Sequence, residues 1–563
     1  MTRKVCYIVA LGAALALSSC GKKLGQFSAE YFTTNPNPLE LVGEKVPGRV
    51  SARIPAEFFL RDVTVTVTPV LVFNGTEVSS TPYSFQGEKV RGNNPIISFE
   101  YGGNATIPVQ FAWQPDMAKS ELELDFLVTQ GKSQYVLPRV KVGTGVVATA
   151  ALATATTVKP AQAVDAFQRQ IDTQYAADIR FLVNQANIRS TELNSNAMNE
   201  LRREILAAAN DSTRSITELN IQSYASPEGA LDLNTRLAQQ REANTSDYLR
   251  EHLAQQHITE FGELTAQFTA EDWEGFQRLV AQSDIQDKDL ILSVLSMYKD
   301  PEEREREIRN LSNVFEQLAE EILPQLRYSR ITATISVVGK TDTELMEAAL
   351  NDPSSLTIEE LLFAATLTDD NAQRARIYEA ATKAYPSDYR GWNNLGQTQY
   401  IAGNYNAAEA SFKKAASLDR NATEPAMNLG LIELNKGNYQ RAHQLFGSAA
   451  GTTELNEALG VYYLKTGDNA AALRAFGNSK SNNAALAQIL NKDYTKAKQT
   501  LASISEPNAT TYYLMAVLGA RTGNEQMLNT NLRQAIRIDP SLANAARVDA
   551  EFEGFNLTRA FSK

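Results

Sequence analysis

Residues 392–415, WNNLGQTQYIAGNYNAAEASFKKA, decide the fold of the last third of this chain. The same spacing of small and aromatic residues returns thirty-four residues later, and a third copy follows. Small residues that alternate with large ones at this period indicate pairs of packed helices stacked into a solenoid. In the first two copies the matching positions are Leu395 and Leu429, Gly396 and Gly430, Gly403 and Gly437, Tyr405 and Tyr439, Ala408 and Ala442, Phe412 and Phe446, and Ala415 and Ala449. In the third copy they are Leu459, Gly460, Gly467, Ala472 and Phe476.

This pattern resembles the tetratricopeptide repeat, and we expect an all-α solenoid over about 345–550 with a tail at 551–563. Weaker flanking copies and one shortened unit leave the repeat number at five or six. The resemblance implies a concave groove that binds an extended peptide or a helix of a partner protein. Asn-rich positions fall near the inner helices, where amides in this family can clamp a peptide backbone; solvated polar surface is the alternative. These candidate groove residues are Asn393, Asn394, Asn428 and Asn456.

The first twenty residues have the pattern of an export signal. Arg3 and Lys4 precede an uncharged run from 5 to 17, which is long enough for a secretory signal and too short to span a bilayer. The run ends in Leu-Ser-Ser-Cys at 17–20, which resembles the lipobox of bacterial lipoproteins. The resemblance implies a signal peptide over 1–19, a lipid on Cys20 and a tether over 20–45. A secretory signal with a chance cysteine is the alternative. Gly21 is not the Asp that retains lipoproteins at the inner membrane, and acidic export residues are missing after it, so we expect the periplasmic face of the outer membrane.

Composition restricts the partners and the chemistry. The net charge of −11 and the lack of a basic block argue against nucleic acid as a partner. Cys6 and Cys20 are the two cysteines, and processing leaves one that carries lipid, so no thiol remains for a disulfide, a zinc site or a nucleophile. His252 and His257 are five residues apart, off the spacing of four that places two metal ligands on one helix face. We therefore expect no metal, no cofactor and no catalytic residues.

Two further domains precede the repeats. Residues 46–147 contain short runs that alternate apolar and polar residues between Gly- and Asn-containing turns, which predicts an antiparallel β-sandwich. Pro108 makes one of these runs an edge strand. An Ala- and Thr-rich linker is expected over 148–163. Residues 164–340 then mix strands and amphipathic helices in an α+β arrangement.

The α+β block contains the stretch IQSYASPEGALDLNTRLAQQR at 221–241, which resembles the OmpA-like domain of Gram-negative envelopes. Gly229, Asn234, Leu237 and Arg241 match its motif, whereas Ser226 stands where the motif has Asp. The resemblance implies an α+β fold over 164–340 with a helical insertion at about 256–325. It also implies a site for the peptide stem of peptidoglycan, in which Asp takes an ammonium and Arg a carboxylate. The candidate site residues are Ser226, Glu228, Asp232, Asn234 and Arg241.

These observations predict a multidomain, non-enzymatic outer-membrane lipoprotein that acts as an envelope scaffold. Lipid would bind it to the membrane, and its repeats would bind an unknown partner protein, with peptidoglycan as a further partner. One alternative is a pure interaction protein whose OmpA-like domain binds no wall. Another is an envelope hydrolase, which requires a buried Ser-His-acid cluster and has no Gly-x-Ser-x-Gly motif to support it.

Overall fold

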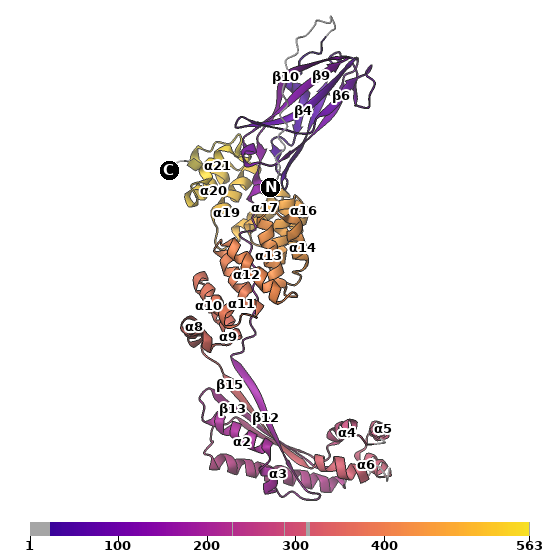
Figure 1. The fold of residues 1–563 in the computed structure, drawn as a ribbon, viewed down its shortest axis with the longest axis vertical. Helices are drawn as coiled ribbons and strands as arrows, with labels where there is room; N and C mark the ends of the chain where they lie inside the picture. The colour runs from indigo at the N-terminus through magenta and orange to yellow at the C-terminus, as the bar shows by residue number, and fades with distance from the viewer. Residues whose placement is uncertain (1–22, 228, 286–287, 311–315, 562–563) are drawn as a thin grey trace. The chain divides into compact units, whose positions relative to one another are not determined.

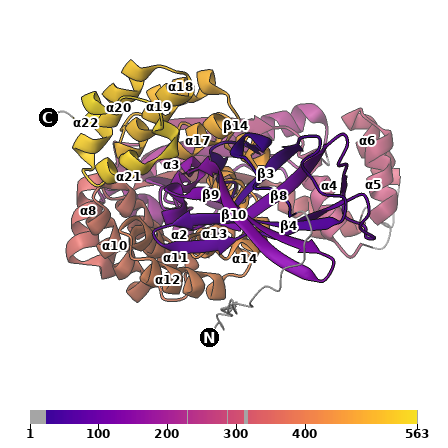
Figure 2. The same cartoon turned by 90° about the horizontal axis from the view of Figure 1, so that it is seen from above.

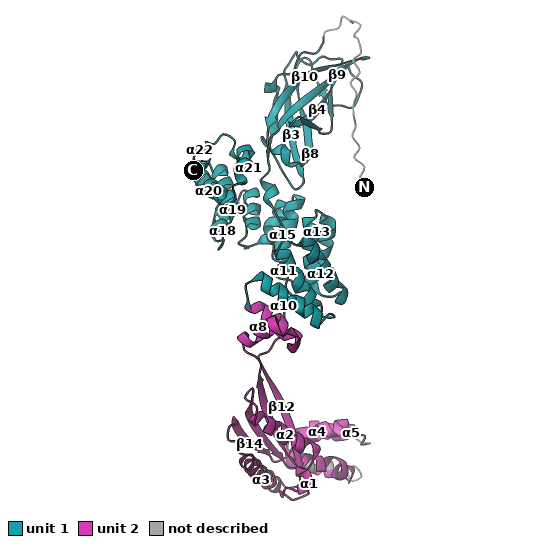
Figure 3. Ribbon diagram, turned by 60° about the vertical axis from the view of Figure 1, so that its left-hand side comes forward, with its two compact units in different colours: residues 1–164, 368–563 teal, residues 165–367 magenta. Residues whose placement is uncertain are grey.

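The computed structural model describes residues 23–561 except residue 228, residues 286–287 and residues 311–315. The expected signal peptide over 1–19 and the expected lipid site at Cys20 lie outside the described residues. The chain forms two compact units, coloured separately in Figure 3. The first contains residues 1–164 and 368–563, and the second contains residues 165–367. Among the residues described, no helix combines the length and the apolar character that crossing a bilayer requires.

The first unit begins with two β-sheets that share one hydrophobic core (Figure 1). The three-stranded sheet has the order β1 (Phe32–Asn35), β3 (Lys45–Ile54), β8 (Gly103–Ala112). The larger sheet has the order β10 (Ser133–Thr144), β9 (Glu121–Gln130), β4 (Val63–Phe73), β6 (Tyr83–Gly87), β7 (Ile96–Ile97), with β5 (Thr76–Ser79) beside β4. Two short strands, β2 (Leu39–Glu40) and β11 (Val146–Val147), pair in parallel. The short 3₁₀ turns are η1 (Ala29–Tyr31), η2 (Pro115–Ala118) and η3 (Thr149–Leu152).

Alternation along the strands builds this core. On β4 the side chains of Val63, Val65 and Val67 are fully buried, whereas the threonines between them are partly exposed. β8 lies at the edge of its sheet, as Pro108 predicts. The expected tether over 20–45 differs from the structure, because Leu24 and Phe27 are buried among the core aromatics. The sheet domain therefore begins well before residue 46.

The second unit contains a four-stranded sheet of order β12 (Gln170–Arg180), β15 (Tyr328–Val338), β13 (Arg214–Tyr224), β14 (Glu263–Thr269). Helices α2 (Asn196–Ala209) and α3 (Leu231–Gln255) pack on the face that Leu219 and Ile221 enter. The helical insertion expected over 256–325 begins later, because β14 pairs in parallel with β13 and satisfies its backbone there. The helices beyond it are α4 (Trp273–Gln282), α5 (Lys288–Met297) and α6 (Pro301–Asn310), with short turns η4 (Leu318–Ile322) and η5 (Leu323–Leu326); α1 (Ser190–Leu193) precedes α2.

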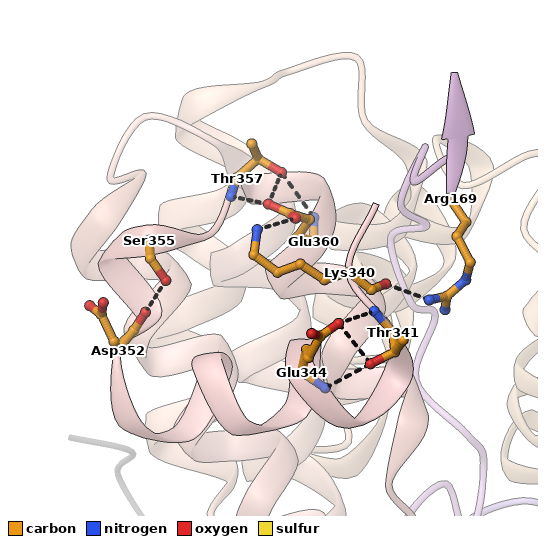
Figure 4. Close-up of polar contacts among 8 residues, drawn as sticks. All are labelled: Arg169, Lys340, Thr341, Glu344, Asp352, Ser355, Thr357 and Glu360. Atoms are coloured by element: carbon orange, nitrogen blue, oxygen red, sulfur yellow. Dashed lines mark hydrogen bonds and ion pairs between the residues drawn. The ribbon is translucent and has the colours of Figure 1, made fainter. Parts of the chain in front are cut away.

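Two capped helices end the second unit. Thr341 and Glu344 form a capping box at the start of α8 (Asp342–Asn351). Thr357 and Glu360 form another at α9 (Ile358–Ala364), and Lys340 pairs with Glu360 at 2.9 Å (Figure 4). Each box satisfies backbone N–H groups that the first helical turn leaves unpaired. The expected repeat boundary at 345 thus differs from the structure, which assigns these helices to the second unit. The 3₁₀ turns here are η6 (Pro353–Ser355) and η7 (Ala365–Leu367).

Antiparallel helix pairs make up the rest of the first unit (Figure 1). After α10 (Asn371–Ala384) the pairs are α11 (Tyr389–Ile401) with α12 (Tyr405–Leu418), α13 (Thr423–Asn435) with α14 (Tyr439–Gly447), α15 (Leu455–Thr466) with α16 (Asn469–Phe476), α17 (Asn482–Leu490) with α18 (Tyr494–Ala502), and α19 (Ala509–Arg521) with α20 (Glu525–Ile538). The expected C-terminal tail is structured, because Phe552 and Ala560 are buried against these helices. Figure 2 shows α17 to α22 grouped together, including α21 (Leu542–Val548) and α22 (Thr558–Phe561), which flank η8 (Ala550–Phe552).

The repeated glycines allow each pair to close. A Cβ built on Gly396, Gly430 or Gly460 would lie 2.4–2.6 Å from the ring of the repeated Phe in the next helix. Those rings, of Phe412, Phe446 and Phe476, are buried. The small-large alternation of the sequence is therefore the contact that holds the two helices of a pair together.

Candidate functional site: a peptide groove on the solenoid

A segment of the chain itself, extended apart from a turn at residues 155–158, lies on the face formed by the first helices of the pairs, here called the inner face. This segment, residues 153–163, connects the β-sheets to the second unit and is here called the strap. Its N-terminal end contacts α17 and its C-terminal end contacts α11 and α10. The strap therefore runs opposite to the order of the repeats. The expected linker over 148–163 is part of the first unit, and half of its residues are buried there.

Two asparagines hold strap peptide groups by both donor and acceptor. The Asn428 Oδ1 accepts from the Ala161 N–H at 2.7 Å, and its Nδ2 donates to the Ala161 carbonyl at 2.8 Å. Asn394 repeats this geometry on Ala163, at 2.9 Å from the N–H and 2.8 Å to the carbonyl. An amide side chain in this orientation replaces the neighbour that a strand would have in a sheet. Both asparagines bind backbone atoms of the strap, so these hydrogen bonds do not depend on the strap side chains at these positions.

Three neighbouring polar side chains on α11 form further hydrogen bonds with the strap backbone. Asn393 donates to the Ala161 carbonyl at 3.0 Å and accepts from Asn428 at 3.0 Å, which fixes both amides. Gln397 donates to the Pro160 carbonyl at 2.8 Å, and the Tyr400 hydroxyl donates to the Ala155 carbonyl at 2.8 Å. Burial raises the pKa of Tyr400 well above its ordinary value, so the hydroxyl remains a neutral donor.

Asn483 on α17 holds the other end of the strap. Its Oδ1 accepts from the Thr154 N–H at 3.1 Å and its Nδ2 donates to the Thr154 carbonyl at 2.9 Å. Gln397, Tyr400 and Asn483 were not among the residues predicted from the sequence. A signal was present for two of them, because Asn393, Gln397 and Tyr400 are spaced by four and three residues and share one helix face. Asn456 was predicted but is exposed on α15.

The strap buries small side chains against the helices. Ala153, Ala155, Val158, Ala161 and Ala163 are each at most 3 % exposed. Thr156, Thr157 and Lys159 between them are exposed to solvent. Apolar inward positions and polar outward ones, with the backbone bonded to side-chain amides, are the features of a peptide in a groove.

Asn428→Ala should weaken the attachment of the strap. The substitution leaves the Ala161 N–H buried without its acceptor and removes a donor from the Asn393 amide, at a cost of about 1–3 kcal/mol. Hydrogen exchange should show faster exchange of the Ala161 and Ala163 amides, while the amides of α19 and α20 keep their protection. Asn456→Ala is the matched control, because this side chain is exposed on the same solenoid, and it should change neither rate. Equal effects of the two variants would contradict this assignment of the clamp.

A second cavity lies in the second unit. It has a volume of about 320 Å³, and Ser226, Asn234 and Arg241 are among the residues that line it. Ser226 is buried, and its hydroxyl accepts from the Arg327 Nε at 3.3 Å. Asn234 donates to Glu271 at 3.1 Å. Three of the five residues predicted to form the wall site are thus brought together.

The other predicted residues of this site are placed differently. Asp232 is exposed in the first turn of α3 and is not among the residues that line the cavity. Glu228 lies outside the described residues. Arg241 is 1 % exposed and donates to the carbonyls of Tyr224 at 2.8 Å, Gln185 at 3.0 Å and Leu182 at 3.4 Å. These bonds connect α3 to the ends of two strands, which is a structural role for the guanidinium.

Two of the three histidines stack on tyrosine rings. His252 stacks on Tyr248 with ring centroids 6.1 Å apart, and burial lowers its pKa. His443 is exposed on α14 and stacks on Tyr462 at 5.0 Å. His257 is exposed after α3. These positions supply no argument for a hydrolase. Among the residues described, no three His, Cys, Asp or Glu side chains gather as a metal site would require.

A sequence-profile match to a known family lies within the solenoid. Residues 389–421 match the sequence profile of the tetratricopeptide repeat. No curated protein matches the chain in a sequence search. Among solved structures, Pseudomonas aeruginosa pilF is 19 % identical, with a TM-score of 0.28, over 38 % of this chain and 100 % of that one. YrrB, a tetratricopeptide protein with an unusual peptide-binding site, is 23 % identical, with a TM-score of 0.24, over 31 % of this chain and 98 % of that one.

A third similar structure is the Cut9–Hcn1 hetero-tetramer of the APC/C. It is 15 % identical, with a TM-score of 0.32, over 59 % of this chain and 76 % of that one. The profile match coincides with the α11–α12 pair, whose Gly-Phe contact recurs in the next two pairs. The chain therefore contains tetratricopeptide repeats, which indicate a protein-interaction or scaffold role.

Proposed function

We propose that this protein is a non-enzymatic, lipid-anchored scaffold on the periplasmic face of the outer membrane, whose solenoid binds a partner protein. The observation that carries the proposal is the row of amide clamps on the inner face. Asn394, Asn428 and Asn483 each hold one peptide group by its N–H and its carbonyl. Such contacts suit an extended peptide of another protein as well as the chain's own.

Crosslinking in the envelope tests the partner. A photoreactive residue at the exposed strap position Lys159, or at the exposed Lys413 on α12, should capture a protein that mass spectrometry identifies. The same residue at the exposed Arg250 on α3 in the second unit is the control and should not capture that protein. Capture from Arg250 alone, or from none of the three, would count against a solenoid-bound partner.

The membrane anchor rests on the lipobox resemblance at 17–20. Cells supplied with labelled palmitate should incorporate the label into the wild-type protein and not into Cys20→Ala. The wild type should fractionate with the outer membrane, and the variant should not. A wild-type protein that takes up no label and is recovered in the soluble fraction would remove the anchor from the proposal.

Peptidoglycan is a second candidate partner, favoured by the cavity that brings Ser226, Asn234 and Arg241 together. In an OmpA-like domain the position of Ser226 carries the Asp that pairs with the stem-peptide ammonium. Ser226→Asp should therefore increase retention on purified peptidoglycan, by about tenfold for one added charge-assisted hydrogen bond.

Asp232→Asn is the control for this experiment, because its exposed carboxylate lies outside the cavity lining and its removal should leave retention unchanged. Salt should weaken the added retention by Ser226→Asp, since the new contact is ionic. If neither the wild type nor Ser226→Asp is retained, the second unit binds no wall and the interaction role of the solenoid stands alone.

A further inference from the structure

We infer that the strap is an intramolecular ligand that keeps the inner face closed, and that a partner binds there by replacing it with an extended segment of small residues. This inference rests on the proposed function in that the solenoid binds a protein. The strap touches the inner face in the way a bound peptide does. Most of its hydrogen bonds to the helices run between its own backbone and the side chains of α11, α13 and α17. The side chains of Gln162 and Thr157 add one bond each, to Tyr378 and Asn483.

The chemistry of the inner face selects the replacing segment. The peptide groups at strap positions 154, 161 and 163 are held by amides that accept any residue with a backbone N–H, which excludes only proline. Specificity must then come from the inward side chains, which are alanines, one valine and one proline, all of them buried. Interiors packed at this density leave no room for a longer side chain. The partner segment therefore has uncharged, mostly Ala-sized residues at its inward positions, whereas an outward position can carry a charge, as Lys159 does in the strap.

Part of the inner face remains open beside the strap. A cavity of about 490 Å³ lies next to Thr154, Ala155 and Thr156, between the strap and residues of α12 to α15. Tyr405, Tyr439 and Lys465 are among its lining residues. Burial lowers the pKa of Lys465, and burial together with a hydrogen bond to Glu44 raises the pKa of Tyr439 to about 12. A partner segment can contact the solenoid here before it displaces the strap.

The covalent connection determines how strongly the strap competes. A short linked segment is present at an effective concentration on the order of millimolar, so a free peptide of equal intrinsic affinity is strongly disfavoured. Release of the strap should consequently raise the affinity for a free peptide by about 100-fold or more. A partner that also contacts the solenoid at a second place overcomes this competition, because the second contact raises the effective concentration of its own segment at the inner face.

A labelled peptide tests the inference in the full-length chain. The probe is a fluorescent synthetic peptide with the sequence of residues 153–163, ATATTVKPAQA. In the receptor variant these eleven residues are replaced by a Gly-Ser linker of the same length. Fluorescence anisotropy should show saturable binding to this variant and at least 100-fold weaker binding to the wild type. A probe with Glu at the position of Ala161 should not bind, because that side chain is 1 % exposed.

Two substitutions in the receptor variant locate the binding. Asn428→Ala should weaken the probe by about tenfold or more, and Asn456→Ala should leave it unchanged. Absence of probe binding to a receptor variant that keeps its helical circular dichroism would overturn the inference. So would equal binding to the wild type.

Hydrogen exchange on the wild type keeps the inference testable if the receptor variant fails to fold. The Ala161 and Ala163 amides should exchange by local opening, at least tenfold faster than amides in the centre of α13. Exchange of both sets only on global unfolding would show that the strap is permanent core and would overturn the inference. A partner crosslinked from Lys413 without probe binding would likewise overturn it while leaving the scaffold role intact. Probe binding with no crosslinked partner would contradict the scaffold role instead.

Discussion

Phe446→Ala should lower the free energy of unfolding of the solenoid by about 3–5 kcal/mol, the cost of deleting a buried aromatic ring. The ring is 2 % exposed and packs against Gly430 in the preceding helix. Its removal leaves a cavity between α13 and α14 that the glycine, which has no side chain, cannot fill. Denaturant-dependent hydrogen exchange of α13 and α14 amides measures this loss separately from the second unit.

Glycine substitutions provide the matched controls for this contact. A Cβ on Gly430 would lie 2.4 Å from the Phe446 ring, so Gly430→Ala should destabilise by about 1–3 kcal/mol through overpacking. Gly447, at the end of α14, has nothing within 4 Å of such a Cβ, and Gly447→Ala should be neutral or slightly stabilising. Combining Gly430→Ala with Phe446→Leu should cost less than the sum of the two, since the smaller side chain relieves the clash. Strict additivity would show that the two residues do not act through one contact.

Arg241→Ala should destabilise the second unit by about 3–5 kcal/mol. The guanidinium donates to the carbonyls of Leu182, Gln185 and Tyr224, and hydrogen bonds from a charged donor contribute about 1.5–3 kcal/mol each. The side chain also lies 5.0 Å over the ring of Phe181. Hydrogen exchange of β13 and α3 amides should report the loss.

Arg236→Ala is the matched control on the same helix. Its side chain is exposed and donates to the carbonyl of Asp232 one turn away, so its removal should cost less than about 0.5 kcal/mol. Similar losses for both variants would contradict the structural role of Arg241. Because Arg241→Ala is expected to loosen the fold, its failure to bind peptidoglycan would not identify Arg241 as a ligand residue. Ser226→Asp tests the wall site without this complication.

Much of the fold could be predicted where the signal is local. A core residue recurs every few positions in the Gly-Phe pairs of the repeats and in the alternating valines of β4. The structure shows the Gly-Phe contacts and the alternating burial of β4 that these patterns predict. β14 could have been found in the same way, because Leu264 and Ala266 alternate and contact the core of the second unit. Residues 20–45 were expected to be a tether, and their place in the β-sheet domain was missed for a different reason. Leu24 and Phe27 are isolated apolar residues without periodicity, and only the sheets that receive them give them a place.

The same difference between local and tertiary information applies to the two candidate sites. Residue type and helix position predicted amide groups near the inner face, and the structure places Asn393, Asn394 and Asn428 against the strap backbone. The motif around Arg241 predicted a ligand contact, whereas the structure shows its guanidinium bonded to three backbone carbonyls. A motif identifies a position in a fold, but burial and hydrogen-bond partners decide what the side chain there can reach.

The amino-acid sequence by itself determined the repeated helix pairs and alternating strands such as β4, because each depends on the spacing of apolar side chains along a short stretch. Only the tertiary structure decided what occupies the inner face of the solenoid. Ala161 and Asn428 are 267 residues apart, and their contact is made through the backbone of one and the amide of the other. Backbone N–H and C=O groups differ little between residues. A segment held mainly through its backbone therefore has no sequence pattern from which its binding site could be predicted. The strap could therefore be recognised as a bound peptide only once the helices that hold it were in place.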